Sequence, residues 1–298
     1  MEYGGQTMCG RLRSVLVRPP QREFSEADPA DWHYTARPSL EAAWEEHRRL
    51  VELLESDGVE VVRHDAELPG LADSLFVFDP VLITDRGAVA LRMGKELRRG
   101  EEEALAGRLA ELGVPLLGRL TGEARAEGGD LLWVDRATLA VGQGFRTNRE
   151  GLRQLRLLLE PLGVELLPVE LPHHHGPDAC LHLGSLISLV DRDLAVVHRP
   201  LLPVRFVEAL AERRIALVDV PADELDGLGP NVLAVAPRRC IALEGNPETR
   251  AGLEAAGCTV RTYRGDELSL KAEGGATCLT LPLRRDPVPA TARAAGAR

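Results

Sequence analysis

Three side chains of this sequence could together form an activated nucleophile. Cys278 follows two glycines and precedes a short apolar run in GGATCLTLPL, and His182 lies between two leucines in CLHL. Glu127 begins EGGD, directly before the apolar run LLWV. An imidazole can move the proton of a neighbouring thiol, and a carboxylate can fix the orientation of that imidazole. These residue types therefore indicate covalent catalysis by cysteine, if the fold brings them together.

Each of these residues also has a simpler explanation. A histidine among apolar residues is often part of the protein core, with its hydrogen bonds made there. Glu127 and Asp130 could be solvated acids of a turn, although the two glycines between them would let a ligand or another backbone approach closely. The elements that must position these residues therefore need to be identified.

Those elements repeat along the chain. Four segments each contain an apolar strand, a tight polar turn and a second apolar strand, which is typical of a β-hairpin. They are LITDRGAVAL (82–91), LWVDRATLAV (132–141), SLVDRDLAVV (188–197) and AVAPRRCIAL (234–243). A helical pattern and another apolar run follow each hairpin. The spacing predicts a helix after the second hairpin, with Asn148 as its N-cap, and another after the fourth, with Asn246 as its N-cap.

A fifth unit at the start of the chain lacks one strand. It has an apolar strand in RSVLVRPP, a predicted helix from about Ser39 to Asp57 and a strand in VEVVRH, but no second hairpin strand. The C-terminal run TCLTLPL could supply it, which would place Cys278 on the closing strand. The alternative is that hairpins and helices alternate by coincidence, as they do in many α/β proteins.

If the two ends pair, five ββαβ units close into a ring. We therefore predict an α/β fold, a five-bladed ββαβ propeller with pseudo-fivefold symmetry, in a single domain over residues 1–285. Residues 286–298 are small and rich in Pro and Ala, which predicts a disordered tail.

Composition narrows the class of protein. The chain has 298 residues, a net charge of −10 and no long basic stretch, so nucleic acid and anionic membranes are disfavoured as partners and a small cationic substrate is compatible. No apolar run approaches the roughly 20 residues of a membrane span, and no signal-peptide pattern is present, so we expect a cytoplasmic protein.

Five cysteines without CxxC spacing argue against disulfides and a zinc knuckle, and apart from Cys278 we expect them to be small core or surface residues. Adjacent histidines cannot all point at one ion, so HHH (173–175) predicts a loop rather than a metal site.

Four motifs, in their order, resemble those of a known group of enzymes. FVFDP, EGGDLLWVD followed by GFRTN, CLHL and GGATCLTLPL are similar to the guanidine-modifying or pentein group, which comprises arginine deiminases, amidinotransferases and dimethylarginine dimethylaminohydrolases. The resemblance covers about residues 10 to 285. It implies a five-bladed α/β propeller with a central active site, in which Cys278 is the nucleophile, His182 the general acid/base and Glu127 the residue that orients His182. It implies neither a metal nor an organic cofactor.

The resemblance also implies residues that bind the substrate. Asp79 in FVFDP matches the aspartate that binds the substrate guanidinium, and Asp73 matches a further acidic position of the dimethylarginine hydrolases. Arg146 in GFRTN matches an arginine for the substrate α-carboxylate. Arg98 is a looser match to a second such arginine, and Arg92 competes with it; a solvated surface arginine is the alternative for both.

We also include Asp130 among the candidate substrate-binding residues. The implied reaction is hydrolysis of the guanidinium C–N bond of arginine or an N-methylated arginine, through a thiouronium on Cys278, with release of a ureido product such as citrulline. The rival interpretations are an arginine deiminase, an amidinotransferase and a propeller that binds a ligand without chemistry. The sequence leaves a homodimer open.

Two positions depart from the pattern. Arginine deiminases and amidinotransferases commonly have an aspartate two residues after the histidine, where this chain has Gly184. Dimethylarginine hydrolases usually have an acid directly before the residue that matches Asp79, where this chain has Phe78. These departures put the substrate in doubt and suggest room for an apolar substituent on the guanidinium.

Overall fold

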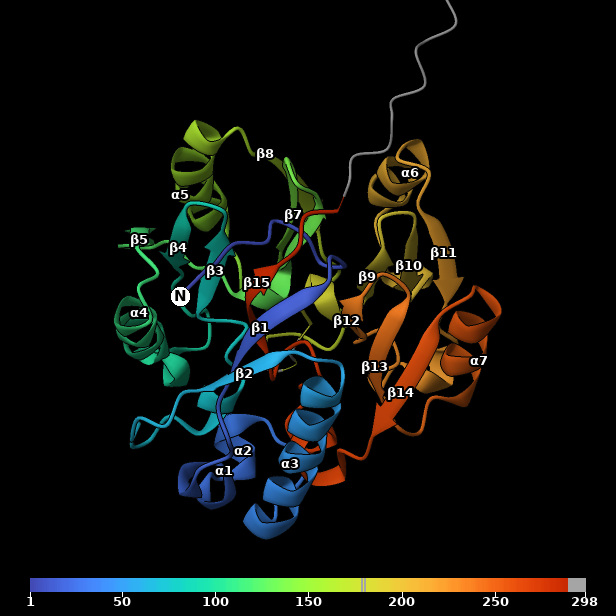
Figure 1. Cartoon of the computed structure of the whole chain (residues 1–298). Helices are drawn as coiled ribbons and strands as arrows, with labels where there is room; N and C mark the ends of the chain where they lie inside the picture. Colours follow the sequence, from blue (N-terminus) through green and yellow to red (C-terminus); the bar gives the residue numbers. More distant parts are fainter. Residues whose placement is uncertain (178, 180, 289–298) are drawn as a thin grey trace, which may run out of the picture.

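The computed structural model describes residues 1–177, 179 and 181–288, which form five three-stranded sheets (Figure 1). Their strand orders are β15-β1-β2, β3-β4-β5, β6-β7-β8, β9-β10-β11 and β12-β13-β14. The strands are β1 (Leu12–Val17), β2 (Glu60–Arg63), β3 (Val81–Thr84), β4 (Gly87–Ala90), β5 (Leu116–Arg119), β6 (Leu131–Asp135), β7 (Thr138–Gln143), β8 (Glu165–Glu170), β9 (Ile187–Asp191), β10 (Leu194–Val197), β11 (Ala216–Asp219), β12 (Leu233–Ala236), β13 (Arg239–Leu243), β14 (Thr259–Tyr263) and β15 (Leu281–Arg285).

Each sheet combines a hairpin with one parallel strand. In the third sheet of the chain, β7 pairs antiparallel with β6 and parallel with β8, and α5 connects β7 to β8. The helices lie at the periphery of the molecule, outside the sheets (Figure 1). They are α1 (Arg22–Glu26), α2 (Pro29–Trp32), α3 (Leu40–Ser56), α4 (Glu101–Glu111), α5 (Arg149–Leu159), α6 (Val204–Glu212) and α7 (Pro247–Ala255). The four predicted hairpins and the predicted α/β class with five units are confirmed.

The two ends of the described chain meet in one sheet. β15 pairs antiparallel with β1, with Leu281 opposite Leu16, so the last strand completes the first unit as predicted. One detail of the prediction was wrong. Cys278 does not lie on β15; it lies in the turn that precedes the strand.

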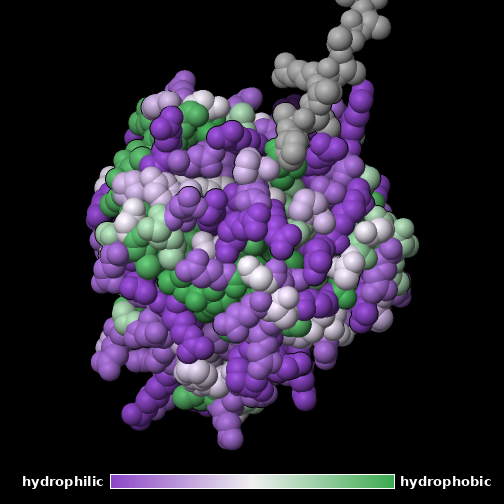
Figure 2. All heavy atoms as spheres, viewed as in Figure 1, coloured by the Kyte–Doolittle hydropathy of each residue, from purple (hydrophilic) through white to green (hydrophobic). Residues whose placement is uncertain are grey.

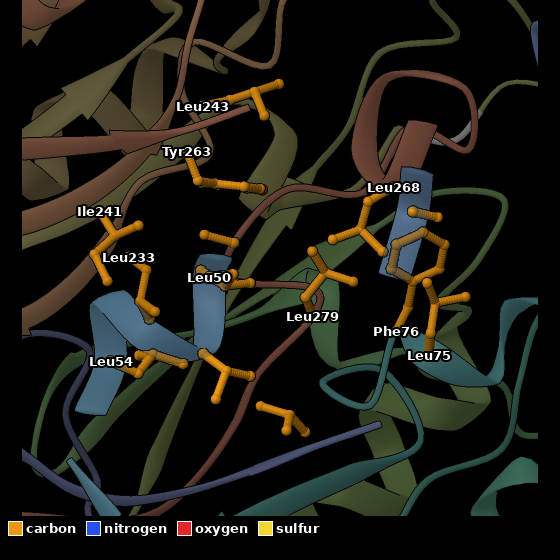
Figure 3. Packing of buried hydrophobic residues seen from close by; sticks show 14 of the residues in the cluster. Leu50, Leu54, Leu75, Phe76, Leu233, Ile241, Leu243, Tyr263, Leu268 and Leu279 are labelled. Atoms are coloured by element: carbon orange, nitrogen blue, oxygen red, sulfur yellow. The ribbon is translucent and has the colours of Figure 1, made fainter. Parts of the chain in front are cut away.

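Apolar side chains between neighbouring units hold the sheets together. Figure 3 shows part of one buried cluster, in which Leu50 and Leu54 of α3 lie near Leu233 and Ile241 of the fifth sheet. All four side chains are at most 2% exposed. Fully burying a leucine or isoleucine stabilises a fold by about 1.5–3 kcal/mol. The unit formed by β15, β1 and β2 is therefore fixed to the neighbouring fifth sheet by packing.

The two predicted helix caps differ in outcome. The side chain of Asn148 caps α5, because its Oδ1 accepts the N–H of Gly151 at 2.8 Å. Asn246 occupies the N-cap position of α7 but does not cap it, and its Nδ2 donates to the carbonyl of Gly227. The carboxylate of Glu224 accepts the first N–H groups of α7 instead. A distant acid has replaced the local cap, which the local sequence could not indicate.

Hydrophilic side chains cover most of the face seen in Figure 2, with apolar side chains between them. Within the described part of the chain, none of the helices combines the length and the apolar character needed to cross a bilayer. The backbone of Asp286, the first residue of the predicted tail, donates to the carbonyl of Arg11. Residues 289–298 of that tail, and Cys180, lie outside the described residues, and the single domain stays a prediction.

Candidate active site

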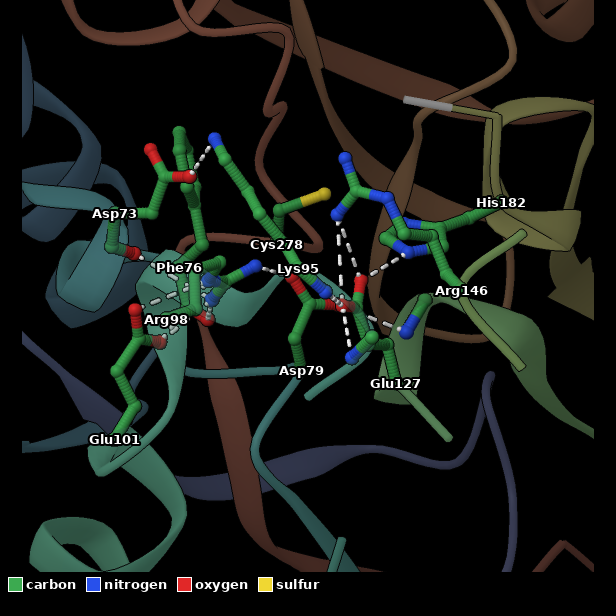
Figure 4. A network of polar contacts seen from close by, with 12 residues as sticks. Asp73, Phe76, Asp79, Lys95, Arg98, Glu101, Glu127, Arg146, His182 and Cys278 are labelled. Atoms are coloured by element: carbon green, nitrogen blue, oxygen red, sulfur yellow. Dashed lines mark hydrogen bonds and ion pairs between the residues drawn. The ribbon is translucent and has the colours of Figure 1, made fainter. Parts of the chain in front are cut away.

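Residues from distant parts of the sequence line one cavity. Cys278, His182, Asp79 and Arg146 all contribute to its wall, together with Asp73. Figure 4 shows their side chains converging from several elements. The sequence-predicted nucleophile and its predicted acid/base partner therefore face the same space. Glu127 does not line the cavity itself, but its side chain contacts His182 and Arg146, which do.

The imidazole of His182 is held by Glu127. His182 lies directly before η5 (Leu183–Ser185), and its Nε2 is 2.7 Å from Oε2 of Glu127. His182 is 4% exposed and Glu127 is fully buried. A buried carboxylate on one ring nitrogen fixes the tautomer and the orientation of an imidazole. The contact predicted from the sequence is therefore present.

Glu127 is itself surrounded by donors. Its Oε1 accepts the backbone N–H groups of Gly94 and Lys95 at 2.8 and 3.0 Å, and its Oε2 pairs with Nη1 of Arg146 at 3.1 Å. Burial alone would raise the pKa of Glu127, but the charge of Arg146 and the hydrogen bond to His182 outweigh burial and lower this pKa. The Glu127 carboxyl is therefore an anion that stabilises positive charge on the imidazole.

The glycines of EGGD make room for these groups. A Cβ at Gly129 would come within 2.3 Å of Nδ1 of His182, and a Cβ at Gly128 within 2.1 Å of the carbonyl oxygen of Phe78. Close approach was expected from the sequence. The structure shows which groups approach: the imidazole and the backbone beside Asp79.

The sulfur of Cys278 has a polar neighbour that the sequence did not indicate. Nδ2 of Asn231 donates to Sγ of Cys278 at 3.3 Å, while Oδ1 of Asn231 accepts the N–H of Thr277 at 3.1 Å. An amide N–H that points at sulfur stabilises negative charge on it. Asn231 lies between a Gly-Pro turn and β12, a setting that carries no catalytic pattern.

The glycines before Cys278 lie in close contact with protein side chains. A Cβ at Gly274 would meet the ring of Phe76 at 2.1 Å, and one at Gly275 would meet the Asn231 side chain at 2.6 Å. These small residues therefore admit protein side chains that support the cysteine turn.

Asp79 is held in place by two donors. Its Oδ1 accepts the N–H of Gly129 at 2.9 Å, and its Oδ2 pairs with Nη1 of Arg98 at 2.7 Å. Asp79 lines the cavity and is 3% exposed. Since each carboxylate oxygen has a second lone pair, Asp79 can still accept N–H groups of a planar cation.

Arg98, the looser match to a carboxylate-binding arginine, lines the cavity with its guanidinium held by buried acids, and its binding of a substrate carboxylate stays a prediction. It lies in η2 (Glu96–Arg98) and is 3% exposed. Its guanidinium pairs with Asp79 and with Glu101, and it also donates to the carbonyl of Phe76 at 3.1 Å. Burial raises the pKa of Glu101 to about 7, although the charge of Arg98 opposes this shift. Arg98 positions Asp79; its competitor, Arg92, does not line the cavity and donates to the carbonyl of Ala124.

Asp130 was also predicted to touch the substrate, and the structure contradicts this. It is fully buried, does not line the cavity, and its Oδ1 accepts the N–H of Leu183 at 3.0 Å. Burial raises the pKa of Asp130 to about 6. Asp130 therefore supports the backbone next to His182.

Arg146, like Arg98, lines the cavity. It is 7% exposed, and its Nη1 pairs with Glu127. Figure 4 shows its guanidinium on the same side as the sulfur of Cys278. A guanidinium on a cavity wall is suited to bind an anionic group of a ligand.

Asp73 lies at another part of the cavity wall. Its Oδ1 accepts the hydroxyl of Tyr34 at 2.6 Å and its Oδ2 pairs with Nζ of Lys95 at 2.6 Å. Burial, together with the charge of Asp73, raises the pKa of Tyr34, so the phenol keeps its proton and donates it. The sequence indicated neither Tyr34 nor Lys95.

Apolar residues form another part of the cavity wall. Met8, Phe78, Leu131 and Ile187 line it, and so does Gly184. A Cβ at Gly184 would lie 3.0 Å from the carbonyl oxygen of Gly129, so this position is also tightly packed. The two departures from the sequence pattern therefore lie on one wall that can contact an apolar group.

A metal is the alternative occupant of such a cluster. Among the described residues, ligand atoms of Asp79, Glu127 and His182 lie within 4.8 Å of one another. Every carboxylate oxygen of Asp79 and Glu127, however, already accepts from protein N–H groups, two of them on arginines. Because N–H donors already occupy these oxygens, the cluster suits further N–H donors, such as those of a guanidinium, better than direct metal ligation.

Comparison with known proteins supports the same group of enzymes. The sequence profile of the family "N,N dimethylarginine dimethylhydrolase, eukaryotic" matches residues 25–285. The chain belongs to this family. It is 28% identical to the N(G),N(G)-dimethylarginine dimethylaminohydrolase of Pseudomonas aeruginosa, over 91% of this chain and 99% of that protein. It is 30% identical to the enzyme of the same name from Streptomyces coelicolor, over 91% of this chain and 97% of that protein.

A solved structure shows that the fold is shared. The Pseudomonas aeruginosa enzyme, as a cysteine-to-serine mutant complexed with citrulline, superposes with a TM-score of 0.76 at 24% identity, covering 91% of this chain and 99% of that one. Arginine deiminases and an amidinotransferase are also among the similar proteins. The resemblance to guanidine-modifying enzymes that the sequence motifs predicted is therefore confirmed.

Proposed function

We propose that the protein hydrolyses the guanidinium C–N bond of an N-methylated arginine and releases a ureido product such as citrulline. The observation that carries this proposal is the arrangement around one cavity: the Cys278 sulfur, the His182 imidazole held by Glu127, and the Asp79 carboxylate. Membership of the dimethylhydrolase family and the citrulline complex of the Pseudomonas aeruginosa relative support it.

The reaction begins with substrate orientation. A guanidinium carbon is a weak electrophile because its charge is spread over three nitrogens. Asp79 accepts N–H groups of the planar head and holds its carbon facing the sulfur, which is a near-attack geometry. Arg98 fixes Asp79 for this task. Arg146 is placed to bind the substrate carboxylate.

Covalent catalysis follows. The Cys278 thiolate adds to the guanidinium carbon, the C–N bond to the methylated amine breaks, and the imidazolium of His182 protonates the departing amine. The products of this step are the free amine and a thiouronium on Cys278. Water, deprotonated by His182, then attacks that carbon, the C–S bond breaks, and the ureido product and the thiol are released. Glu127 stabilises the imidazolium in both halves of the cycle.

Apolar residues favour a substituted guanidinium over arginine itself. Phe78, Met8 and Leu131 on the cavity wall offer no hydrogen-bond partners to a free terminal NH₂ group, whereas they can pack against N-methyl groups. One methyl group in an apolar pocket contributes about 1–3 kcal/mol to selectivity, or about 10- to 200-fold. We therefore expect dimethylarginine to be preferred over arginine.

A substrate panel tests the proposal. Purified protein is assayed for ureido product with arginine, monomethylarginine, asymmetric dimethylarginine and agmatine. We expect turnover of the methylated arginines, and loss of at least about 10³-fold in kcat for Cys278→Ser. Cys9→Ser, which alters a buried cysteine outside the cavity, is the matched control and should keep full activity. Inactivity of the folded wild type on all four compounds would reject the proposal.

A thiol-directed amidine separates catalysis from simple binding. Chloroacetamidine carries an amidinium that Asp79 can bind next to the sulfur. We expect alkylation of Cys278 to be faster than that of Cys9 and to be slowed by Asp79→Asn. Equal alkylation rates at both cysteines, with no turnover, would instead indicate a binding protein without the chemistry.

A further inference from the structure

Asp79, the residue proposed to bind the substrate guanidinium, already faces a cation of the protein. Its Oδ2 pairs with Nη1 of Arg98 at 2.7 Å, and both side chains line the cavity. A carboxylate oxygen of Asp79 and a ring nitrogen of His182 lie within 4.8 Å of each other, so Asp79 is at the catalytic end of the cavity. A substrate cation and Arg98 would share this one carboxylate, and like charges repel strongly where burial excludes water. Binding of the substrate therefore calls for a second negative charge close to Arg98.

Glu101 provides that charge. It is the first residue of α4, is 2% exposed and does not line the cavity. Its Oε1 and Oε2 accept the Nε–H of Arg98 at 3.0 and 3.1 Å, and Oε2 also accepts an N–H of Nη2 at 2.8 Å. In Figure 4 the guanidinium of Arg98 lies between Glu101 and Asp79. Two acids thus share one protein cation, and one negative charge is left over.

The charge of Arg98 itself is secure. Burial alone would lower the pKa of Arg98, but the charges of Glu101 and Asp79 outweigh burial and raise this pKa. Without Glu101, Arg98 and Asp79 would form a neutral pair. Such a pair attracts a substrate guanidinium less than a group with an excess negative charge does. The charge that a substrate meets at Asp79 therefore depends on Glu101.

From this geometry, and resting on the proposed function, we propose that Glu101 is a positioning residue that keeps the negative charge of Asp79 available to the substrate guanidinium. It acts through Arg98, whose charge it neutralises, and it touches neither the substrate nor the reacting atoms. Glu101 therefore selects for charge: the site binds a guanidinium in preference to a neutral group of the same shape. Because the ureido product is neutral, the same preference assists its release.

Two ligands of the same shape test this proposal. In N5-(dimethylcarbamoyl)ornithine an oxygen replaces one guanidinium nitrogen of asymmetric dimethylarginine, which removes the positive charge. Both ligands are titrated into Cys278→Ser with and without Glu101→Gln. The titrations are made at pH 8, because burial raises the pKa of Glu101 to about 7 and the carboxylate must be ionised.

The expected result is a loss that depends on the charge of the ligand. Glu101→Gln should raise the Kd of dimethylarginine by about 10- to 100-fold and that of the neutral ligand by less than about threefold. Retained binding of the neutral ligand shows that the variant is folded. An equal change in both Kd values would show a merely structural role and overturn the proposal, and so would no change in either.

A second acid of the same helix is the matched control. Glu103→Gln makes the same change of charge two residues further along α4, but the Glu103 side chain is 62% exposed and pairs with Arg119. Both Kd values should therefore stay within about twofold of those of Cys278→Ser, because water screens an exposed charge.

A double variant tests the charge balance directly. Arg98→Met/Glu101→Gln, again in Cys278→Ser, removes one cation and one acid, so the preference for dimethylarginine over the neutral ligand should stay within about threefold of that of Cys278→Ser. Both ligands have the same amino-acid end, so a contact of Arg98 with the carboxylate would cancel in this ratio. If Glu101 had no influence, loss of the Arg98 charge alone would raise the preference more than about tenfold. Such a rise would overturn the proposal, as would a preference as low as that of Glu101→Gln.

Failure of the proposed function gives a different result. The wild type would then turn over no methylated arginine, and Cys278→Ser with Glu101 intact would bind neither ligand. Failure of the role of Glu101 alone leaves turnover by the wild type intact and changes only the response of the variants.

Discussion

Glu127 and Asp130 are separated in sequence by two glycines, and both are fully buried, yet their environments differ. Glu127 accepts from two backbone N–H groups, Arg146 and His182, and its pKa is lowered. Asp130 accepts the N–H of Leu183, and burial raises its pKa to about 6. Burial therefore does not determine the charge of a carboxyl group; the cations and N–H donors around it do.

The comparison also distinguishes a residue that takes part in catalysis, Glu127, from one that supports the backbone, Asp130. Glu127 can stay ionised while the imidazole takes up and releases a proton. Asp130 can become neutral near pH 6 and still accept the Leu183 N–H. Removing the charge should therefore affect the two positions very differently, and substitutions that keep the side-chain shape test this directly.

The largest effect is expected for Glu127→Gln. The amide keeps the size of the side chain but leaves the imidazolium without a counter-charge, so kcat should fall by about 10³- to 10⁴-fold. Asp130→Asn is the matched control, and its kcat should fall less than about tenfold, because the amide oxygen can still accept from Leu183. Steady-state assays with dimethylarginine measure both. Similar losses in the two variants would remove the distinction between them.

The next largest effect is expected for Gly129, the second of the two glycines between these acids. Gly129→Ala places a methyl group against the imidazole, where the available distance is 2.3 Å, so His182 must move and kcat should fall by about 10²-fold. In Gly144→Ala the new methyl group would meet Leu171 at an ordinary 3.5 Å. That control should keep its activity. Full activity of Gly129→Ala would mean that the position of the ring is not limiting.

The two carboxyls should also show opposite pH dependence of stability. The pKa of Asp130 is raised in the folded state, so its contribution to the free energy of unfolding is present below pH 3.8 and is lost as the pH rises through 6. Relative to the wild type, Asp130→Asn should therefore gain up to about 3 kcal/mol between pH 4 and pH 7. Denaturant titrations at several pH values measure this difference. Parallel stability curves would contradict it.

For Glu127 the sign is reversed. Its folded-state pKa is lowered, so its contribution is present above the unfolded-state pKa and is lost as the pH falls. Glu127→Gln should consequently be least stable, relative to the wild type, at neutral pH, and the same denaturant titrations provide the comparison. A deficit that grows towards acid pH would show that the lowered pKa was assigned wrongly.

The smallest effect on kcat is expected for Thr147, which contacts the backbone of Glu127. Thr147 is fully buried, and its hydroxyl oxygen accepts the backbone N–H of Glu127 at 3.2 Å. Thr147→Val leaves that N–H without this partner, which should cost about 1–3 kcal/mol in the free energy of unfolding. Because the Glu127 side chain keeps its own donors, kcat should change only a few-fold. A loss as large as that of Glu127→Gln would place Thr147 within the catalytic unit.

The fold could be predicted because its signals are local and repeated. Each hairpin combines alternating apolar residues with a polar turn, and the missing strand of the first unit had one suitable partner at the end of the chain. The contact between Glu127 and His182, and the cavity that His182 shares with Cys278, were expected from the resemblance to the guanidine-modifying enzymes. The turn around Cys278 was wrongly taken as the start of β15.

The functions of single polar residues were less predictable. Arg98 and Asp130 lie in or near the motifs that carry the catalytic residues, but their side chains bind buried protein groups. Asn231 and Lys95 approach the site from segments without a motif, because their partners are distant in sequence. A side chain's partner is set by the packing of whole units, and spacing along the chain does not report it.

The pairing of β15 with β1 has a consequence for synthesis of the protein. On the ribosome the N-terminal strand emerges early, but one edge of it has no partner until residues 281–285 have been translated. The turn that carries the thiol is fixed only when this last strand docks. A chain that lacks residues 281–285 therefore lacks the strand that fixes this turn, and we expect it to have no aligned nucleophile.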